Sequence, residues 1–148
     1  MVQNKGIMMN EIWEVWHPQS HIIYKAYIHS VIDYECTQML ITLSNNKLQP
    51  HHAVEINFYN GAYASTLLHG TFIQKLKDNL IQEYGKEFLQ TSSCFKIRNS
   101  SYIEWVSAQS YEIVGLPYAQ HFCIFTSDTV VHLIAPYEPH VKFLDAKE

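Results

Sequence analysis

The chain has 148 residues, of which 47% are hydrophobic, 14% aromatic and 16% charged. That length is typical of one domain, and the many aromatic rings exclude an intrinsically disordered chain, which has few aromatics and a high net charge. The formal net charge is −4 and Arg98 is the only arginine, so we expect no nucleic-acid partner, which would require an arginine-rich basic surface.

The first predicted element is a strand over residues 11–16, where aromatic and β-branched residues are concentrated. Successive side chains of a strand point to opposite faces. Trp13 and Trp16 would therefore lie on different sides of this strand, and we expect at least one of them in the core.

Residues 22–34 fit two periodicities. Polar residues recur at every fourth position, at His21, Lys25, His29 and Asp33, as on the solvated face of a helix. The even positions are nearly all apolar, and isoleucine, tyrosine and valine are frequent, as in a strand. We therefore predict a strand here, with a helix as the alternative.

The next strands are predicted over residues 39–43 and 54–59, the second of which alternates apolar with polar residues. Asn60-Gly61 follows directly, and this dipeptide is the strongest short signal for a β-hairpin. Residues 63–69 would then be the returning strand of that hairpin.

The periodicity changes after Gly70, which indicates a helix. Thr71 and Gln74 have the spacing of a capping box, in which two side chains satisfy free N–H groups at a helix start. The predicted main helix covers about residues 71–88, and Gly85 either ends it or weakens its last turn. Its apolar stripe consists of Phe72, Leu76, Leu80, Tyr84 and Phe88.

A short strand is predicted over residues 94–97 and a short helix over about residues 102–110. Ser101 and Glu104 have the spacing of a second capping box at the start of this helix. The predicted strands do not alternate with long crossover helices, which argues against a doubly wound parallel sheet.

Two apolar strands over residues 120–126 and 129–135 flank Ser127-Asp128, and residues 141–144 are a candidate edge strand. Strands therefore come before, between and after the two helices. This order predicts a single α+β domain over residues 1–148, with a largely antiparallel sheet, one main helix and one short helix.

The cysteines do not indicate a secreted protein. Cys36, Cys94 and Cys123 are far apart, and their odd number without a Cys-x-x-Cys pair does not suit a disulfide framework. Residues 1–10 lack the apolar core of a signal peptide, and no apolar run approaches the roughly 20 residues that span a bilayer. We expect a cytoplasmic protein with no membrane partner.

The late hairpin contains the candidate reactive residues. A two-residue turn at Ser127-Asp128 would place Cys123 opposite His132, with His121 next along the same face. An imidazole beside a thiol can create a nucleophile, and Cys-His-His is a ligand set for zinc. The alternative is that all three belong to the core, because their neighbours are apolar and unpaired cysteine is commonly buried.

Residues 94–141 carry four short motifs, and the helix end at Tyr84-Gly85-x-Glu87-Phe88 accompanies them. The motifs are Phe95-Lys96, Asn99-Ser100-x-Tyr102-x-x-Trp105, His121-Phe122 and Tyr137-Glu138-Pro139. They resemble a family of small uncharacterised proteins from Bacillus-like bacteria, and the resemblance extends over most of the chain.

Members of that family have no established activity, and some are encoded near polymorphic-toxin genes, which implies an immunity-like role. This sequence departs from the family pattern at two places. Residues 65–68 are uncharged here, whereas family members often have charged residues there. His132 stands where family members often have an acidic residue. A function that needs those charges is not expected here. Within the motifs, Tyr102 and Trp105 are expected to bury one face of the short helix.

The leading hypothesis is a non-enzymatic, cytoplasmic protein-binding module without a cofactor, whose partner is a protein and, by the resemblance, a toxin. It also rests on the absence of phosphate-binding and nucleophile-elbow motifs. The alternative is a small metal-binding protein or thiol enzyme that uses Cys123, His132 and His121. A small-ligand carrier lined by tyrosines is a third possibility, and the oligomeric state stays open.

Overall fold

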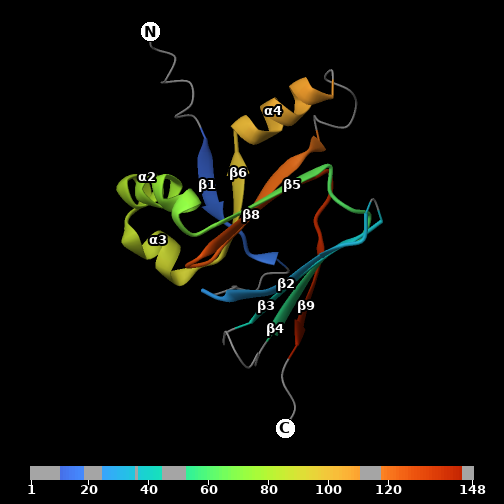
Figure 1. Cartoon of the computed structure of the whole chain (residues 1–148), viewed down its shortest axis with the longest axis horizontal. Coiled ribbons are helices and arrows are strands. Elements are labelled where there is room, and N and C mark those ends of the chain that lie inside the picture. Colours follow the sequence, from blue (N-terminus) through green and yellow to red (C-terminus); the bar gives the residue numbers. More distant parts are fainter. Residues whose placement is uncertain (1–10, 19–24, 36, 45–52, 111–117, 145–148) are drawn as a thin grey trace.

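Figure 1 shows the computed structural model of the chain, which describes residues 11–18, 25–35, 37–44, 53–110 and 118–144. Within these residues the strands form two antiparallel sheets, and helices lie against one of them. The predicted α+β class is confirmed, with the strands divided between two sheets. No helix of this described part is both long and apolar enough to cross a membrane.

The five-stranded sheet has the order β1-β6-β7-β8-β5, and every neighbouring pair is antiparallel. Strands β6, β7 and β8 occupy its centre and are the most deeply buried. The strands are β1 (Ile12–Val15), β5 (Ala64–His69), β6 (Cys94–Arg98), β7 (Gln120–Phe125) and β8 (Thr129–Ala135).

The four-stranded sheet has the order β2-β3-β4-β9 and is also antiparallel throughout. The predicted edge strand near residue 141 is β9, which pairs with β4 at the edge of this sheet. The strands are β2 (Tyr27–Asp33), β3 (Met39–Ser44), β4 (Ala53–Phe58) and β9 (His140–Leu144).

The ambiguous segment 22–34 is a strand over Tyr27–Asp33, which is β2. Lys25, Ala26 and Tyr34 lie outside the strand, and residues 22–24 lie outside the described part. A register shift between Ile28 and Ser30 alters its side-chain alternation. Ile28 and Val31 both pack on the core, whereas Ile32 is exposed. The even positions therefore do not form one apolar face, because a bulge exchanges the two faces of a strand.

The predicted hairpin at Asn60-Gly61 is wrong. The turn itself forms, since Gly61 donates from its N–H to the Phe58 carbonyl at 2.8 Å and has a φ of +79°. Strand β5 then crosses to the other sheet and pairs with β8, and β9 occupies the edge of β4. The Tyr137 hydroxyl stabilises the turn from which β5 leaves the four-stranded sheet, because it accepts from the Asn60 N–H and donates to the Gly61 carbonyl.

The predicted main helix over about residues 71–88 is divided into η2 (Gly70–Ile73), α2 (Gln74–Tyr84) and α3 (Lys86–Thr91). Gly85 has a φ of +90° and a ψ of 161°, which a glycine adopts readily and which interrupts the helix. The first capping box is not formed, because α2 begins at Gln74 without a side-chain cap.

The short helix is α4 (Ser101–Gln109), one residue earlier than predicted at each end. Its cap is Ser100, whose Oγ accepts from the Ile103 N–H at 3.0 Å. The second predicted capping box does not form, because Ser101 lies inside the helix and Ile103 has no polar side chain to complete a box with Ser100. Glu11 adds a second cap, because its Oε2 accepts from the Ser101 N–H at 2.9 Å. A carboxylate at this end also interacts favourably with the helix dipole.

The five-stranded sheet is buried on both faces. One face packs on the four-stranded sheet, and the other packs on α2 and α3. Trp16 lies in the first core and Trp13 in the second, which confirms their predicted placement on different faces. Both are buried, whereas at least one of them was expected in the core. In the core between the sheets, the Phe122 ring packs against Trp16 and Phe58, with centroids 5.1 and 5.3 Å apart.

Phe122→Ala is expected to lower the free energy of unfolding by about 3–5 kcal/mol, because it empties a fully buried site in the core between the sheets. Urea denaturation monitored by circular dichroism measures this change. Phe72→Ala is the matched control, because the Phe72 side chain is 82% exposed. It should change the free energy by less than about 0.5 kcal/mol. Equal effects of the two variants would contradict the described core.

Candidate functional site

A groove of about 520 Å³ lies between α2 and α4 on the helix-facing side of the five-stranded sheet. It exists because α2 and α4 cover different parts of this face. Leu76 contributes from α2, and Tyr102 and Trp105 contribute from α4. His121 of β7 and His132 of β8 reach the groove from the sheet.

The two histidines of the groove are joined in a hydrogen-bonded chain. His121 Nε2 lies 2.8 Å from His132 Nδ1, and His121 Nδ1 lies 2.7 Å from Ser100 Oγ. The same Ser100 oxygen caps α4 by accepting from the Ile103 N–H. The chain therefore links the start of α4 to the middle of β8 through a buried imidazole.

The hydrogen bonds couple the tautomers of the two rings. When the Ser100 hydroxyl donates to His121 Nδ1, His121 must donate from Nε2 to His132 Nδ1, and His132 then carries its proton on Nε2. In the opposite polarity every bond reverses, and His132 Nε2 becomes an acceptor. Because His132 lines the groove, this polarity sets whether the ring offers a donor or an acceptor there.

Both imidazoles are neutral near pH 7. Burial, and secondarily the neighbouring His132, lowers the pKa of His121 to about 3. Burial also lowers the pKa of His132, an effect that the Glu11 carboxylate opposes. A neutral pair of this kind can donate and accept hydrogen bonds without bringing charge into the groove.

The wall made by α4 is held in place by further contacts. The Tyr102 hydroxyl and Thr66 Oγ1 lie 2.7 Å apart, which ties α4 to β5. The rings of Tyr102 and Trp105 are nearly parallel, with an angle of 14° between their planes. Trp105 remains 59% exposed, so the expectation that Tyr102 and Trp105 together bury a face of this helix is wrong for Trp105.

The predicted register of the late hairpin is confirmed. Cys123 is the partner of His132 across β7 and β8, and the Thr126 N–H donates to the Thr129 carbonyl at 2.8 Å around the two-residue turn. Cys123 is nevertheless fully buried in the core beneath the helices, and burial raises its pKa well above the ordinary value. Its thiol is protonated and shielded, which does not suit a nucleophile.

The three candidate metal ligands are not brought together as a metal site. His121 and His132 direct nitrogens at each other in a hydrogen bond. Across the described parts of the chain, no group of three His, Cys, Asp or Glu side chains is disposed to hold a metal ion. Although Cys123 is the cross-strand neighbour of His132, the histidine side chains form hydrogen bonds with each other and with Ser100.

The sequence pattern did not indicate that Ser100, Glu11 and an exposed Trp105 belong to one site. Ser100 lies 21 residues from His121, and Glu11 lies 90 residues from Ser101, so only long-range packing joins them at the groove. A signal for Trp105 was present, since α4 is too short to bury a tryptophan unless another element covers it.

Comparison of the chain with protein-family models, curated proteins and solved structures found no match.

The buried histidines predict a pH dependence of stability. Their folded pKa values lie below the unfolded value of about 6.5, so the unfolded chain binds more protons as the pH falls. The free energy of unfolding therefore has its full value above about pH 6.5 and decreases as the pH falls toward 3. His121→Gln should make this loss shallower by about 1.4 kcal/mol per pH unit between about pH 6 and pH 4.

Urea denaturation at a series of pH values tests this dependence. His140→Gln is the control, because His140 is an exposed residue of β9. It should keep the slope of the unsubstituted protein. A slope that is the same for His121→Gln and the unsubstituted protein would show that the buried imidazoles do not resist protonation.

Proposed function

We propose that this chain is a non-enzymatic, cytoplasmic protein that binds another protein through the groove between α2 and α4. The observation that carries the proposal is the exposed tryptophan in the wall of that groove. Trp105 is 59% exposed and lines the groove beside Tyr102, with Leu76 in the other wall. Tryptophan is among the residues most enriched at the energetic centres of interaction sites.

The α4 wall of the groove has two properties of an interface hot spot: it presents aromatic side chains, and it is held in position before a partner binds. Tryptophan and tyrosine are the residues most enriched at such positions, and Tyr102 and Trp105 stand together on α4. The hydrogen bond between Tyr102 and Thr66 fixes this wall before a partner arrives. A fixed wall reduces the conformational entropy lost on binding, which favours affinity.

The floor of the groove supports recognition of polar groups on the partner. The His121–His132 pair is neutral and part of a hydrogen-bonded chain, so it can match either a donor or an acceptor. A shielded, protonated Cys123 supplies no nucleophile beside it. The family resemblance of the sequence motifs makes a secreted toxin the partner of choice, held inactive in an immunity-like complex.

Co-expression with each toxin encoded at the chain's own locus tests this function. The intact protein should restore growth, and Trp105→Ala should weaken the complex by about 2 kcal/mol or more, about 30-fold in Kd, as for other hot-spot tryptophans. Calorimetric titration of the purified pair measures the Kd. Stability should change little, because Trp105 is an exposed residue.

Tyr34→Ala is the matched control. Tyr34 is 50% exposed and directly follows β2, in the other sheet, so its loss should leave both growth rescue and Kd unchanged. Failure of the intact protein to rescue growth against every toxin of its locus would overturn the immunity-like role. Equal weakening by the two variants would overturn the groove as the binding face.

The alternative function, metal or thiol chemistry at Cys123, His132 and His121, has its own test. In a Cys36→Ser variant the thiols that remain are Cys94 and Cys123, and both are fully buried. We expect them to react with Ellman's reagent only after unfolding, and elemental analysis to find no stoichiometric metal. A fast native thiol reaction, or about one zinc per chain, would favour the alternative.

A further inference from the structure

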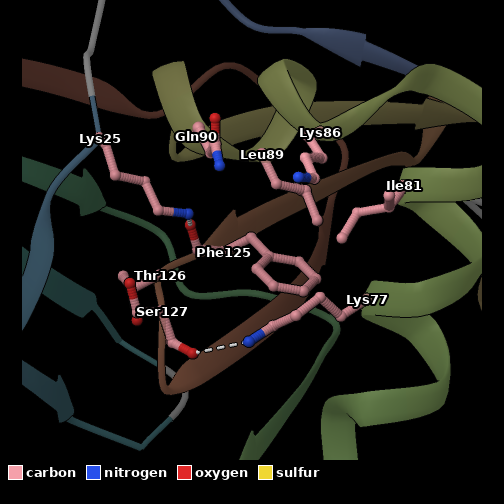
Figure 2. Close-up of a pocket in the computed structure, with 9 residues that line it drawn as sticks. All are labelled: Lys25, Lys77, Ile81, Lys86, Leu89, Gln90, Phe125, Thr126 and Ser127. Carbon is pink, nitrogen blue, oxygen red and sulfur yellow. Dashed lines mark hydrogen bonds between the residues drawn. The ribbon is translucent and has the colours of Figure 1, made fainter.

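A second cavity, of about 400 Å³, lies at the opposite side of α2 and shares no lining residue with the groove. Three segments that are distant in the sequence form it: Lys25 just before β2, the helices α2 and α3, and the turn after β7. Figure 2 shows the Phe125 ring at its centre, with Ile81 and Leu89 directed toward the ring from the two helices.

Three lysines surround this cavity, at residues 25, 77 and 86, in a chain whose formal net charge is −4. None of the described residues that line it is acidic. Lys96 and Arg98 form ion pairs with Glu138 and Glu14 elsewhere in the fold. Three ammonium groups around one cavity without a lining carboxylate produce a local positive potential that attracts an anion.

Two of the lysines are held in position by backbone carbonyls. Lys25 Nζ donates to the Phe125 carbonyl at 3.2 Å, and Lys77 Nζ donates to the Ser127 carbonyl at 3.1 Å, the bond drawn in Figure 2. An ammonium group has three N–H donors, so each retains donors for a ligand. Burial, and then the charge of Lys77, lowers the pKa of Lys25 to about 8. A bound anion would favour the charged form of this lysine.

The apolar part of the cavity defines the rest of the ligand. Ile81, Leu89 and the Phe125 ring form a surface on which an aromatic or alkyl group can pack, and the volume is within the range of small-molecule sites. A phosphate monoester carries up to two negative charges and three strong acceptor oxygens. It can therefore bond to more than one of the lysines that line the cavity, for which a carboxylate with a single charge is less suited.

We propose that this cavity is a binding site for a phosphate monoester with an apolar body, with the phosphate held by Lys25, Lys77 and Lys86. The apolar body packs on Phe125 and Ile81. The site is independent of the protein-binding groove, because it is built from the other side of α2 and from the turn after β7.

Titration of the purified protein with phenyl phosphate, followed by amide chemical shifts in NMR spectra, tests the site. We expect saturable shifts that are concentrated at residues 125–127 and in α3. Lys77→Met should weaken phenyl phosphate binding by about tenfold or more, as expected for loss of a charge-assisted hydrogen bond. Lys75→Met is the matched control, because Lys75 is an exposed residue of the same helix outside the cavity, and it should leave binding unchanged.

Two further ligands separate the parts of the proposal. Inorganic phosphate should bind more weakly than phenyl phosphate, because it lacks the ring, and benzoate more weakly because it carries one charge. Equal binding of inorganic phosphate would overturn the apolar subsite, and equal binding of benzoate would overturn the assignment to a phosphate. Absence of saturable binding, or equal effects of Lys77→Met and Lys75→Met, would overturn the site itself.

Discussion

The architecture depends on burial of both faces of β7. Phe122 and Ile124 point into the core between the sheets, whereas Cys123 and Phe125 point into the core beneath α2 and α3. A strand enclosed on both faces cannot alternate apolar with solvated residues, so its sequence is apolar at nearly every position. This constraint explains why Cys123, the most plausible nucleophile from the sequence, is unavailable to solvent.

Incomplete cover of the helix-facing side creates both cavities. Helices α2 and α3 cover the end of the sheet near Phe125, and α4 stands near His121. Between them the sheet presents a hydrogen-bonded histidine pair, which is compatible with burial because both ring nitrogens of His121 have partners, Ser100 Oγ and His132 Nδ1. At the other side of α2, the lysines rather than histidines border the open space.

The histidine pair keeps imidazolium charge out of the groove. Burial and then the neighbouring His132 lower the pKa of His121, whereas a carboxylate in the place of His132 would stabilise a neighbouring imidazolium. Among the described residues that line the groove, the charged side chain is Glu11, whose Oε2 accepts from the Ser101 N–H at the start of α4.

The sequence by itself determined the features that depend on local periodicity and turn chemistry. These are the α+β class, the strand character of β2, the existence of α2 and α4, and the pairing of Cys123 with His132 across the turn at residues 127–128. Only the tertiary structure decided which distant segments meet. The Asn60-Gly61 turn formed as its residues require, yet β5 joined β8, because the choice of a strand partner depends on core packing and on the Tyr137 hydroxyl. The same reason explains the Ser100–His121–His132 chain and the lysine-lined cavity, whose residues have no common local pattern and meet only when the two cores form.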